Sequence, residues 1–142
     1  MKRLLAGIVL CTVAYGMLVA GDIGTQRRLT KESVTRIEKD LVKAFESNSP
    51  GLQASAAITL IQVRMEVPEY EWSNSVIPLM RIVNSENTDA DARIAAALAL
   101  YELRTDRGDF SIVRNARFTS NNRVKRFCAL LAANRQLEKA VP

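Results

Sequence analysis

Few residues in this chain of 142 residues have the types and spacing that enzymatic chemistry requires. It contains no histidine, which removes the commonest general base and the commonest metal ligand. The six glycines are scattered, and no phosphate-binding loop, C-x-x-C or G-x-S-x-G motif occurs. Glu66, Glu69 and Glu71 surround Pro68 in a predicted loop, where solvated carboxylates are expected rather than a catalytic acid pair. The sequence therefore predicts a protein that is not an enzyme and that holds no cofactor and no metal ion.

Basic residues cluster near the C-terminus. Residues 22–89 contain eight basic and ten acidic residues, whereas residues 90–142 contain ten basic and five acidic ones. Six of the basic residues fall within 20 positions: Arg107, Arg114, Arg117, Arg123, Lys125 and Arg126. This cluster is a candidate site for an anionic partner, which could be nucleic acid, a phospholipid surface or an acidic protein. The alternative is a solvated helical face paired locally with Asp106 and Asp109, and we favour it because no aromatic residues are interleaved for base stacking.

The first residues have the three parts of a secretory signal peptide. Lys2 and Arg3 precede an uncharged run that ends in small residues at Gly21. We expect a signal peptide over residues 1–21 and a single periplasmic or secreted domain over residues 22–142. The alternatives are a membrane anchor over residues 4–20, short for a bilayer span at 17 residues, and a buried helix. Export argues against nucleic acid as a partner, and a membrane is expected as a partner only if this segment is uncleaved.

Cleavage would remove Cys11 and leave Cys128 as the single cysteine, so no intramolecular disulfide is expected. Phe127 and Leu131 share the helical face of Cys128. We therefore expect Cys128 to be a small buried apolar residue rather than a reactive thiol.

The domain is predicted to be all-α, because from Thr30 onward the hydrophobic period is close to 3.6 residues. Thr30 is expected to cap a first helix that ends near Ser47, with Glu38 among the charged residues of its solvated side. Ser49 is expected to cap a second helix, with Pro50 at its first position.

Four more helix starts are predicted further along the chain. Ser75 is the expected cap of a third helix, which would place Pro78 in its first turn, where a missing N–H is tolerated. Thr88 is the expected cap of a fourth helix, in a capping box with Asp91. A short helix over residues 110–117 is expected to hold Phe110 in the core, and a last helix begins near Val124.

Three of these helices share a pattern of small and apolar residues. The matching segments are Ala54–Val63, Ile94–Leu103 and Val124–Ala133, at offsets of 40 and 30 residues. Self-similarity at this period, with two helices per unit, is typical of an α-solenoid. Ala57 and Ala97 are expected to let helix backbones approach closely, with Leu60 and Leu100 filling the space between layers.

The segments Ala92–Leu103, Val76–Met80 and Arg123–Cys128 make the chain resemble the HEAT-like (armadillo-type) repeat family, in particular its short bacterial members. The resemblance covers residues 49–133 and implies about two and a half repeats of antiparallel helix pairs, preceded by an N-terminal capping helix. The third unit comes ten residues early, which favours a compact bundle over a long superhelix. Some relatives are enzymes, but none of their catalytic motifs is matched here.

Two functions follow as expectations. The first is an exported, non-enzymatic scaffold that binds a protein partner through a helical face. The second is a binder of an anionic partner through the basic C-terminal helices.

Overall fold

The computed structural model describes residues 29–140, which form six α-helices and no strand. The helices are α2 (Lys31–Phe45), α3 (Pro50–Glu66), α4 (Ser73–Asn84), α5 (Ala90–Leu103), α6 (Asp106–Phe118) and α7 (Asn122–Ala140). The all-α class is therefore confirmed for this part of the chain. The predicted signal peptide at residues 1–21, with its alternative of an anchor at residues 4–20, lies outside the described residues. Within residues 29–140 no helix has the length and apolar character needed to cross a bilayer.

Two of the predicted helix starts are confirmed in detail. The Thr30 hydroxyl accepts a hydrogen bond from the backbone N–H of Ser33 at 3.2 Å and caps α2. The Ser49 hydroxyl likewise accepts from Leu52 N–H at 3.4 Å, and Pro50 is the first residue of α3. Both helices begin where the sequence predicts, because a hydroxyl acceptor acts within the first turn of each and α3 also has a proline at its first position.

Two other starts differ from the prediction. Asp89, not Thr88, caps α5, because its carboxylate accepts from the N–H of Asp91 at 2.8 Å. Thr105 caps α6 by accepting from Gly108 N–H at 3.1 Å, so α6 begins four residues earlier than expected. The longer α6 turns Ile112 into the core and leaves Phe110 67% exposed, so the prediction that Phe110 is a core residue is wrong.

The start of α4 also differs. The helix begins at Ser73 rather than at Val76, which places Pro78 inside it. The carbonyl that lacks a donor because of Pro78 belongs to Asn74, an exposed residue in the first turn that water can reach. Trp72 precedes the helix without forming a side-chain cap.

Glu38 of α2 supplies the missing cap for α4. Its carboxylate accepts from the backbone N–H groups of Asn74 at 3.1 Å and Ser75 at 3.2 Å. It also accepts from the Ser75 hydroxyl at 3.3 Å and the Tyr70 hydroxyl at 3.0 Å. Glu38 is only 1% exposed, so its predicted place on the solvated side of α2 is wrong. A carboxylate at a helix N-terminus is stabilised by the helix dipole and by these donors, which is why it can be buried here.

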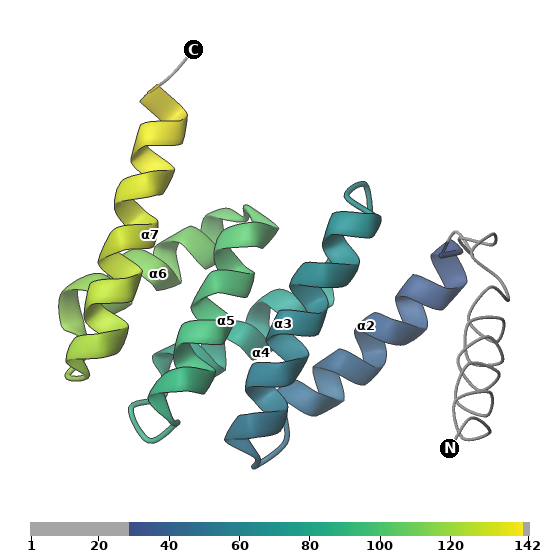
Figure 1. The fold of residues 1–142 in the computed structure, drawn as a ribbon, viewed down its shortest axis with the longest axis horizontal. Coiled ribbons are helices and arrows are strands. Elements are labelled where there is room, and N and C mark those ends of the chain that lie inside the picture. The colour runs from purple at the N-terminus through teal and green to yellow at the C-terminus, as the bar shows by residue number, and fades with distance from the viewer. Residues whose placement is uncertain (1–28, 141–142) are drawn as a thin grey trace, which may run out of the picture.

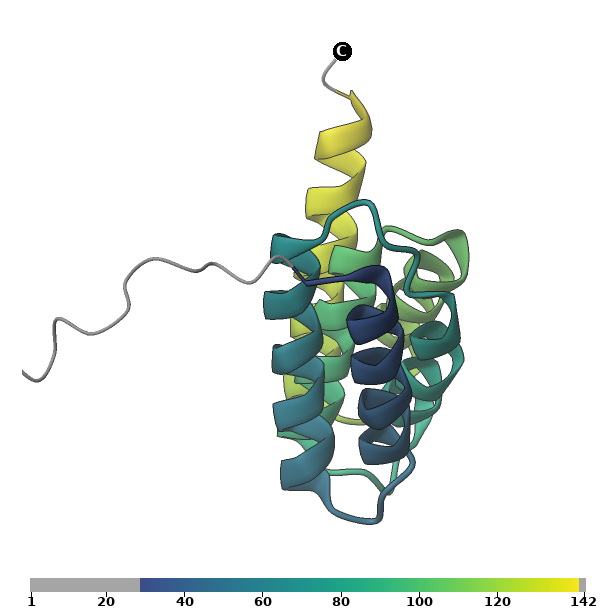
Figure 2. The same cartoon turned by 90° about the vertical axis from the view of Figure 1, so that its right-hand side faces the viewer.

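The six helices lie in two rows, one behind the other (Figure 1). In one row α3 contacts α5 and α5 contacts α7, and in the other α2 contacts α4 and α4 contacts α6. Viewed from the side, α3 lies at one edge and α4 at the other (Figure 2). The three segments that share a sequence pattern lie on α3, α5 and α7, which occupy the same row.

Small residues allow the rows to pack closely. Ala57 and Ala97 are fully buried, and so are Leu60 and Leu100, as the sequence predicts. Gly108 has a related role, because a Cβ atom there would lie 3.2 Å from the carbonyl oxygen of Leu100. Its hydrogen side chain lets α6 approach the backbone of α5.

Candidate functional site

All six residues of the predicted basic cluster are exposed, but they belong to two helices in different rows. Arg107, Arg114 and Arg117 lie on α6, whereas Arg123, Lys125 and Arg126 lie at the start of α7. The structure therefore divides the cluster into two groups.

The group on α6 includes aromatic side chains. Phe110 is 67% and Phe118 is 78% exposed. At 3.6 residues per turn, these two rings fall with the three arginines within about 100° of the helix circumference. We call this set the Arg–Phe stripe: Arg107, Phe110, Arg114, Arg117 and Phe118. The prediction that no aromatic residues are interleaved with the basic cluster is thus wrong for α6.

The inner side of α6 explains why the phenylalanines face outward. Ser111 and Asn115 occupy the buried positions and both hydrogen-bond Asn84 of α4, at 3.1 and 2.6 Å. Because polar groups take these inward positions, the aromatic residues of α6 are left on its outer side.

The buried guanidinium of Arg93 completes this polar contact. Its Nε donates to the carbonyl of Val83 at 3.0 Å, and its terminal nitrogens donate to Glu86, Asn115 and Thr119 at 2.8–3.2 Å. Hydrogen bonds from Arg93, Ser120 and Thr119 lower the pKa of Glu86 to about 2. Arg93 thereby joins α5, the α4–α5 turn and α6, and it fixes the orientation of the Arg–Phe stripe. In the sequence Arg93 is visible only as part of a repeat segment, with no signal that it is buried.

Among residues 29–140, neither Asp106 nor Asp109 pairs with a residue of the basic cluster. Asp109 pairs with Arg135 at 3.2 Å and with Lys139 at 3.6 Å. Arg135 also lies over the ring of Tyr101, 4.1 Å from its centroid. Of the six clustered residues, Arg123 alone has a carboxylate within 4.0 Å among residues 29–140, that of Asp91 at 2.7 Å. Among residues 29–140 the three arginines of the Arg–Phe stripe have no ion-pair partner.

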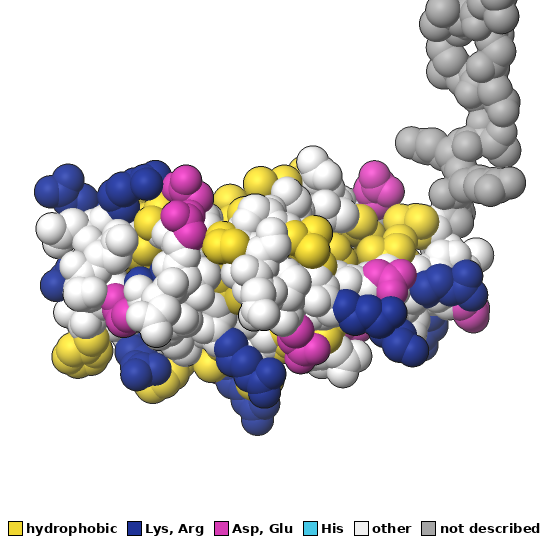
Figure 3. All heavy atoms as spheres, turned by 90° about the horizontal axis from the view of Figure 1, so that it is seen from below, with side chains coloured by type: hydrophobic (Ala, Val, Ile, Leu, Met, Phe, Trp, Pro, Cys, Tyr) yellow, Lys and Arg dark blue, Asp and Glu magenta, His cyan; other side chains and the backbone are white. Residues whose placement is uncertain are grey.

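Both rows have basic side chains, and exposed apolar side chains occur on both. Figure 3 shows Lys and Arg side chains recurring along the lower edge of the molecule, the side of α2, α4 and α6. At the lower left of that view, basic and hydrophobic side chains lie next to each other. Hydrophobic side chains also occur across the upper half, the side of α3, α5 and α7.

We call the second surface the apolar face. It comprises Ile58 and Met65 of α3, Ile94 and Leu98 of α5, and Leu130 and Leu137 of α7. Met65 is 74% and Leu137 is 65% exposed, and Ile94 and Leu98 are half-buried. The pairs on α3 and α7 are each seven residues apart, so each pair lies on one side of its helix.

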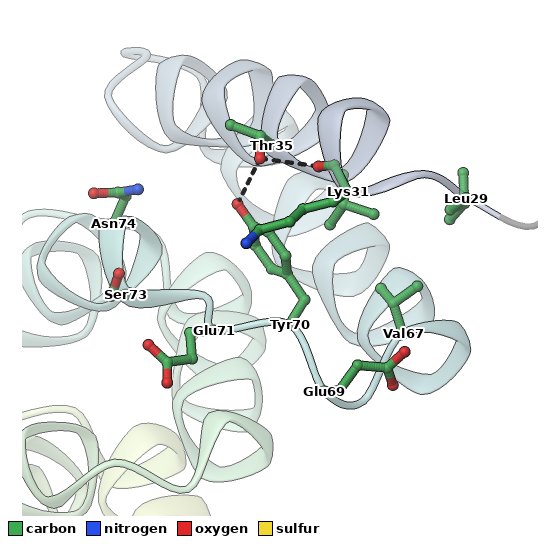
Figure 4. Close-up of a pocket in the computed structure, with 10 residues that line it drawn as sticks. Leu29, Lys31, Thr35, Val67, Glu69, Tyr70, Glu71, Ser73 and Asn74 are labelled. Carbon is green, nitrogen blue, oxygen red and sulfur yellow. Dashed lines mark hydrogen bonds between the residues drawn. The ribbon is translucent and has the colours of Figure 1, made fainter.

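A pocket of about 670 Å³ lies between the start of α2 and the α3–α4 loop (Figure 4). The hydroxyl of Tyr70 donates to Thr35 Oγ1 at 3.3 Å across it. Glu69 and Glu71 are exposed and lie on opposite sides of Tyr70, so they do not form a carboxylate pair. The solvated state predicted for these two carboxylates is confirmed.

Cys128 is completely buried, and desolvation raises the pKa of its thiol to about 11. The expectation of a small buried apolar residue is confirmed. Within residues 29–140 no group of three or more acidic or cysteine side chains is placed to hold a metal ion.

Comparison of the chain with protein-family models, with curated proteins and with solved structures finds no match.

Proposed function

We propose that this chain is a short HEAT-like α-solenoid that acts as an exported, non-enzymatic scaffold and binds a protein partner through the apolar face. The observation that carries the proposal is the exposure of large apolar side chains at seven-residue spacing on α3 and α7. The last helix of a solenoid normally has a polar outer side, so the apolar side of α7, matched by that of α3 in the same row, favours a protein interface.

The repeat architecture is supported by the contacts between alternate helices and by the place of the three matching segments on α3, α5 and α7. In this proposal α2 is the N-terminal capping helix, and two and a half repeats follow it. Contacts between consecutive helices are instead most extensive for α2 with α3, α4 with α5 and α6 with α7, which favours a division into three pairs over one in which α2 stands alone as a cap.

The scaffold proposal is tested by isolating the tagged full chain from the cell envelope at native salt. The test variant combines Met65→Ser with Leu137→Ser, and the matched control combines Arg36→Ser with Lys39→Ser on the exposed side of α2. We expect a protein that the wild type and the control recover equally and that the test variant recovers at least about tenfold less. Equal recovery by all three chains, or no protein above background, contradicts the proposal.

A second candidate function is the binding of an anionic partner through the Arg–Phe stripe. The observation that favours it is that Arg107, Arg114 and Arg117 are exposed and have no carboxylate within 4.0 Å among residues 29–140. Binding of a polyanion such as heparin should then weaken steeply with salt, because counterions are released. A response that does not depend on salt, or that is unchanged by Arg114→Ala with Arg117→Ala, removes this candidate.

A further inference from the structure

The second candidate function does not specify the chemical class of the anionic partner. The composition of the Arg–Phe stripe indicates one class. Resting on that candidate function, we propose that the stripe binds the surface of an anionic phospholipid bilayer. Arg107, Arg114 and Arg117 contact lipid phosphates, while Phe110 and Phe118 enter the boundary between headgroups and acyl chains. Basic side chains combined with large apolar ones on an exposed helical side are the composition that binds such interfaces.

The geometry of the stripe fits a planar surface. Phe110 and Phe118 are eight residues apart, which places them about 12 Å from each other along the helix axis. Arg114 lies between them, so apolar and cationic groups alternate over two turns. The long arginine side chains can reach phosphates while both rings are inserted.

The support of the stripe is rigid. Hydrogen bonds of Ser111, Asn115 and Thr119 hold the opposite side of α6 against α4 and Arg93. The rings therefore cannot turn inward without exposing buried polar groups whose partners would be lost. Two phenylalanines held in water in this way are stabilised when an apolar phase covers them.

The neighbouring helices of the row contribute charge of the same sign. Arg36 and Lys39 of α2 are exposed, and so is Arg81 of α4, whose ion-pair partner among residues 29–140 is the exposed Glu46 at 3.7 Å. Basic side chains thus follow the row from α6 to α2, as the lower edge of Figure 3 shows. A row of helices presents a broad surface to a bilayer, and each basic residue close to an anionic surface adds to the attraction.

Lipid is favoured over nucleic acid or an acidic protein by the sequence before the domain. Kept as an anchor, the apolar segment at residues 4–20 would hold the domain next to a membrane. A membrane surface is then the polyanion nearest to the stripe.

The experiment uses the full chain, because residues 4–20 can themselves associate with lipid, and reads an indole on α6 after subtracting the signal of the buried Trp72, which the wild-type chain supplies. Phe118→Trp places an indole in the stripe, and Leu130→Trp on α7 is the matched control at a 56% exposed position. Each is mixed with vesicles of phosphatidylcholine that have brominated acyl chains, with or without about 30% phosphatidylglycerol. Bromine quenches an indole that enters the bilayer.

We expect quenching of the Phe118→Trp chain by the anionic vesicles only, and its loss at about 0.5 M salt. Adding Arg114→Ala and Arg117→Ala should raise the lipid concentration for half-maximal quenching by about 30-fold. The Leu130→Trp chain should stay unquenched. Quenching that is equal at the two positions, or equal in vesicles without phosphatidylglycerol, overturns the proposal.

Heparin binding distinguishes a bilayer partner from another anionic partner. A chain that binds heparin in a salt-dependent way but is not quenched by anionic vesicles has an anionic partner other than lipid, so the bilayer proposal fails and the second candidate function stands. A chain that binds neither contradicts both.

Discussion

Glu38 shows how one side chain can determine where a distant helix begins. Its Oε1 accepts hydrogen bonds from two backbone N–H groups in the first turn of α4, 36 and 37 residues further along the chain. Helix N-termini have N–H groups without intrahelical acceptors, and α4 has no side-chain cap of its own. The burial of Glu38 therefore couples the position of α4 to that of α2.

Replacement of Glu38 by alanine should lower the free energy of unfolding by about 2–3 kcal/mol, because buried donors of α4 lose a charged acceptor. Urea denaturation followed by circular dichroism measures the change. Lys43→Ala is the matched control on α2, since among residues 29–140 Lys43 forms a single, exposed ion pair, with Asp40, and its loss should change stability by less than about 0.5 kcal/mol. Equal midpoints for the two variants would show that Glu38 does not cap α4.

Glu86 should make stability depend on pH in the acid range. Hydrogen bonds in the folded protein lower its pKa from 4.5 to about 2, so the unfolded chain binds this proton more readily. The resulting stabilisation is fully present above pH 4.5 and is lost as the pH falls toward 2. Measured between these limits, the unfolding free energy of the Glu86→Gln variant should change less than that of the wild type. Parallel curves would mean that the Arg93 network does not hold this carboxylate.

At the scale of the elements, the contact between α5 and α6 depends on Gly108. A Cβ atom there would lie 3.0 Å from the hydroxyl oxygen of Thr105 and 3.2 Å from the carbonyl of Leu100. Because that carbonyl belongs to the backbone of α5, the crowding can be relieved only by moving one helix. Gly51 is the opposite case, since a Cβ atom added there meets nothing within 4 Å.

The two glycines should therefore respond to alanine with opposite signs. Gly108→Ala should destabilise the protein by about 1–2 kcal/mol, because overpacking outweighs the gain in helix propensity. Gly51→Ala should stabilise it by up to about 1 kcal/mol, since the unfolded chain loses freedom without a clash. Thermal unfolding of both variants beside the wild type measures the difference. If both variants gain stability, α6 does not approach α5 as closely as described.

Helices and their local caps could be predicted because their determinants lie within a few residues. Thr30 and Ser49 act on N–H groups three positions away, and Pro50 acts at its own position. The burial of Glu38 and the exposure of Phe110 could not be predicted, because both depend on partners far along the chain. An inward side of α6 built from Ser111 and Asn115 becomes understandable only when Asn84 and Arg93 are seen against it.

The basic residues of the candidate site could be predicted from the sequence, but their division between two helices could not. The six clustered basic residues are all exposed, as a binding site requires. Sequence distance does not show that α6 and α7 belong to different rows, so the division of the cluster could not be foreseen. Phe110 is predicted in the core and found outside it, because the buried side of α6 includes the polar residues Ser111 and Asn115 beside Ile112.

At the scale of the whole molecule, α5 is the helix on which the others depend. It contacts α3, α4, α6 and α7, and six of its 14 residues are buried. At the end of α7, by contrast, residues 136–140 are all exposed. Stability should therefore decrease from α5 toward the C-terminus.

Hydrogen exchange should reveal this order. Amides around Leu100 should exchange only through global unfolding, whereas those of residues 136–140 should exchange much faster through local fraying. Leu100→Ala leaves a cavity where a fully buried side chain packs, and should lower the free energy of unfolding by about 2–5 kcal/mol. If the helices unfold as one unit, protection in the central turns of α3, α4 and α6 should fall by the same amount as in α5. A loss confined to α5 and its nearest turn would instead show that the helix pairs unfold separately, as weakly coupled repeats do.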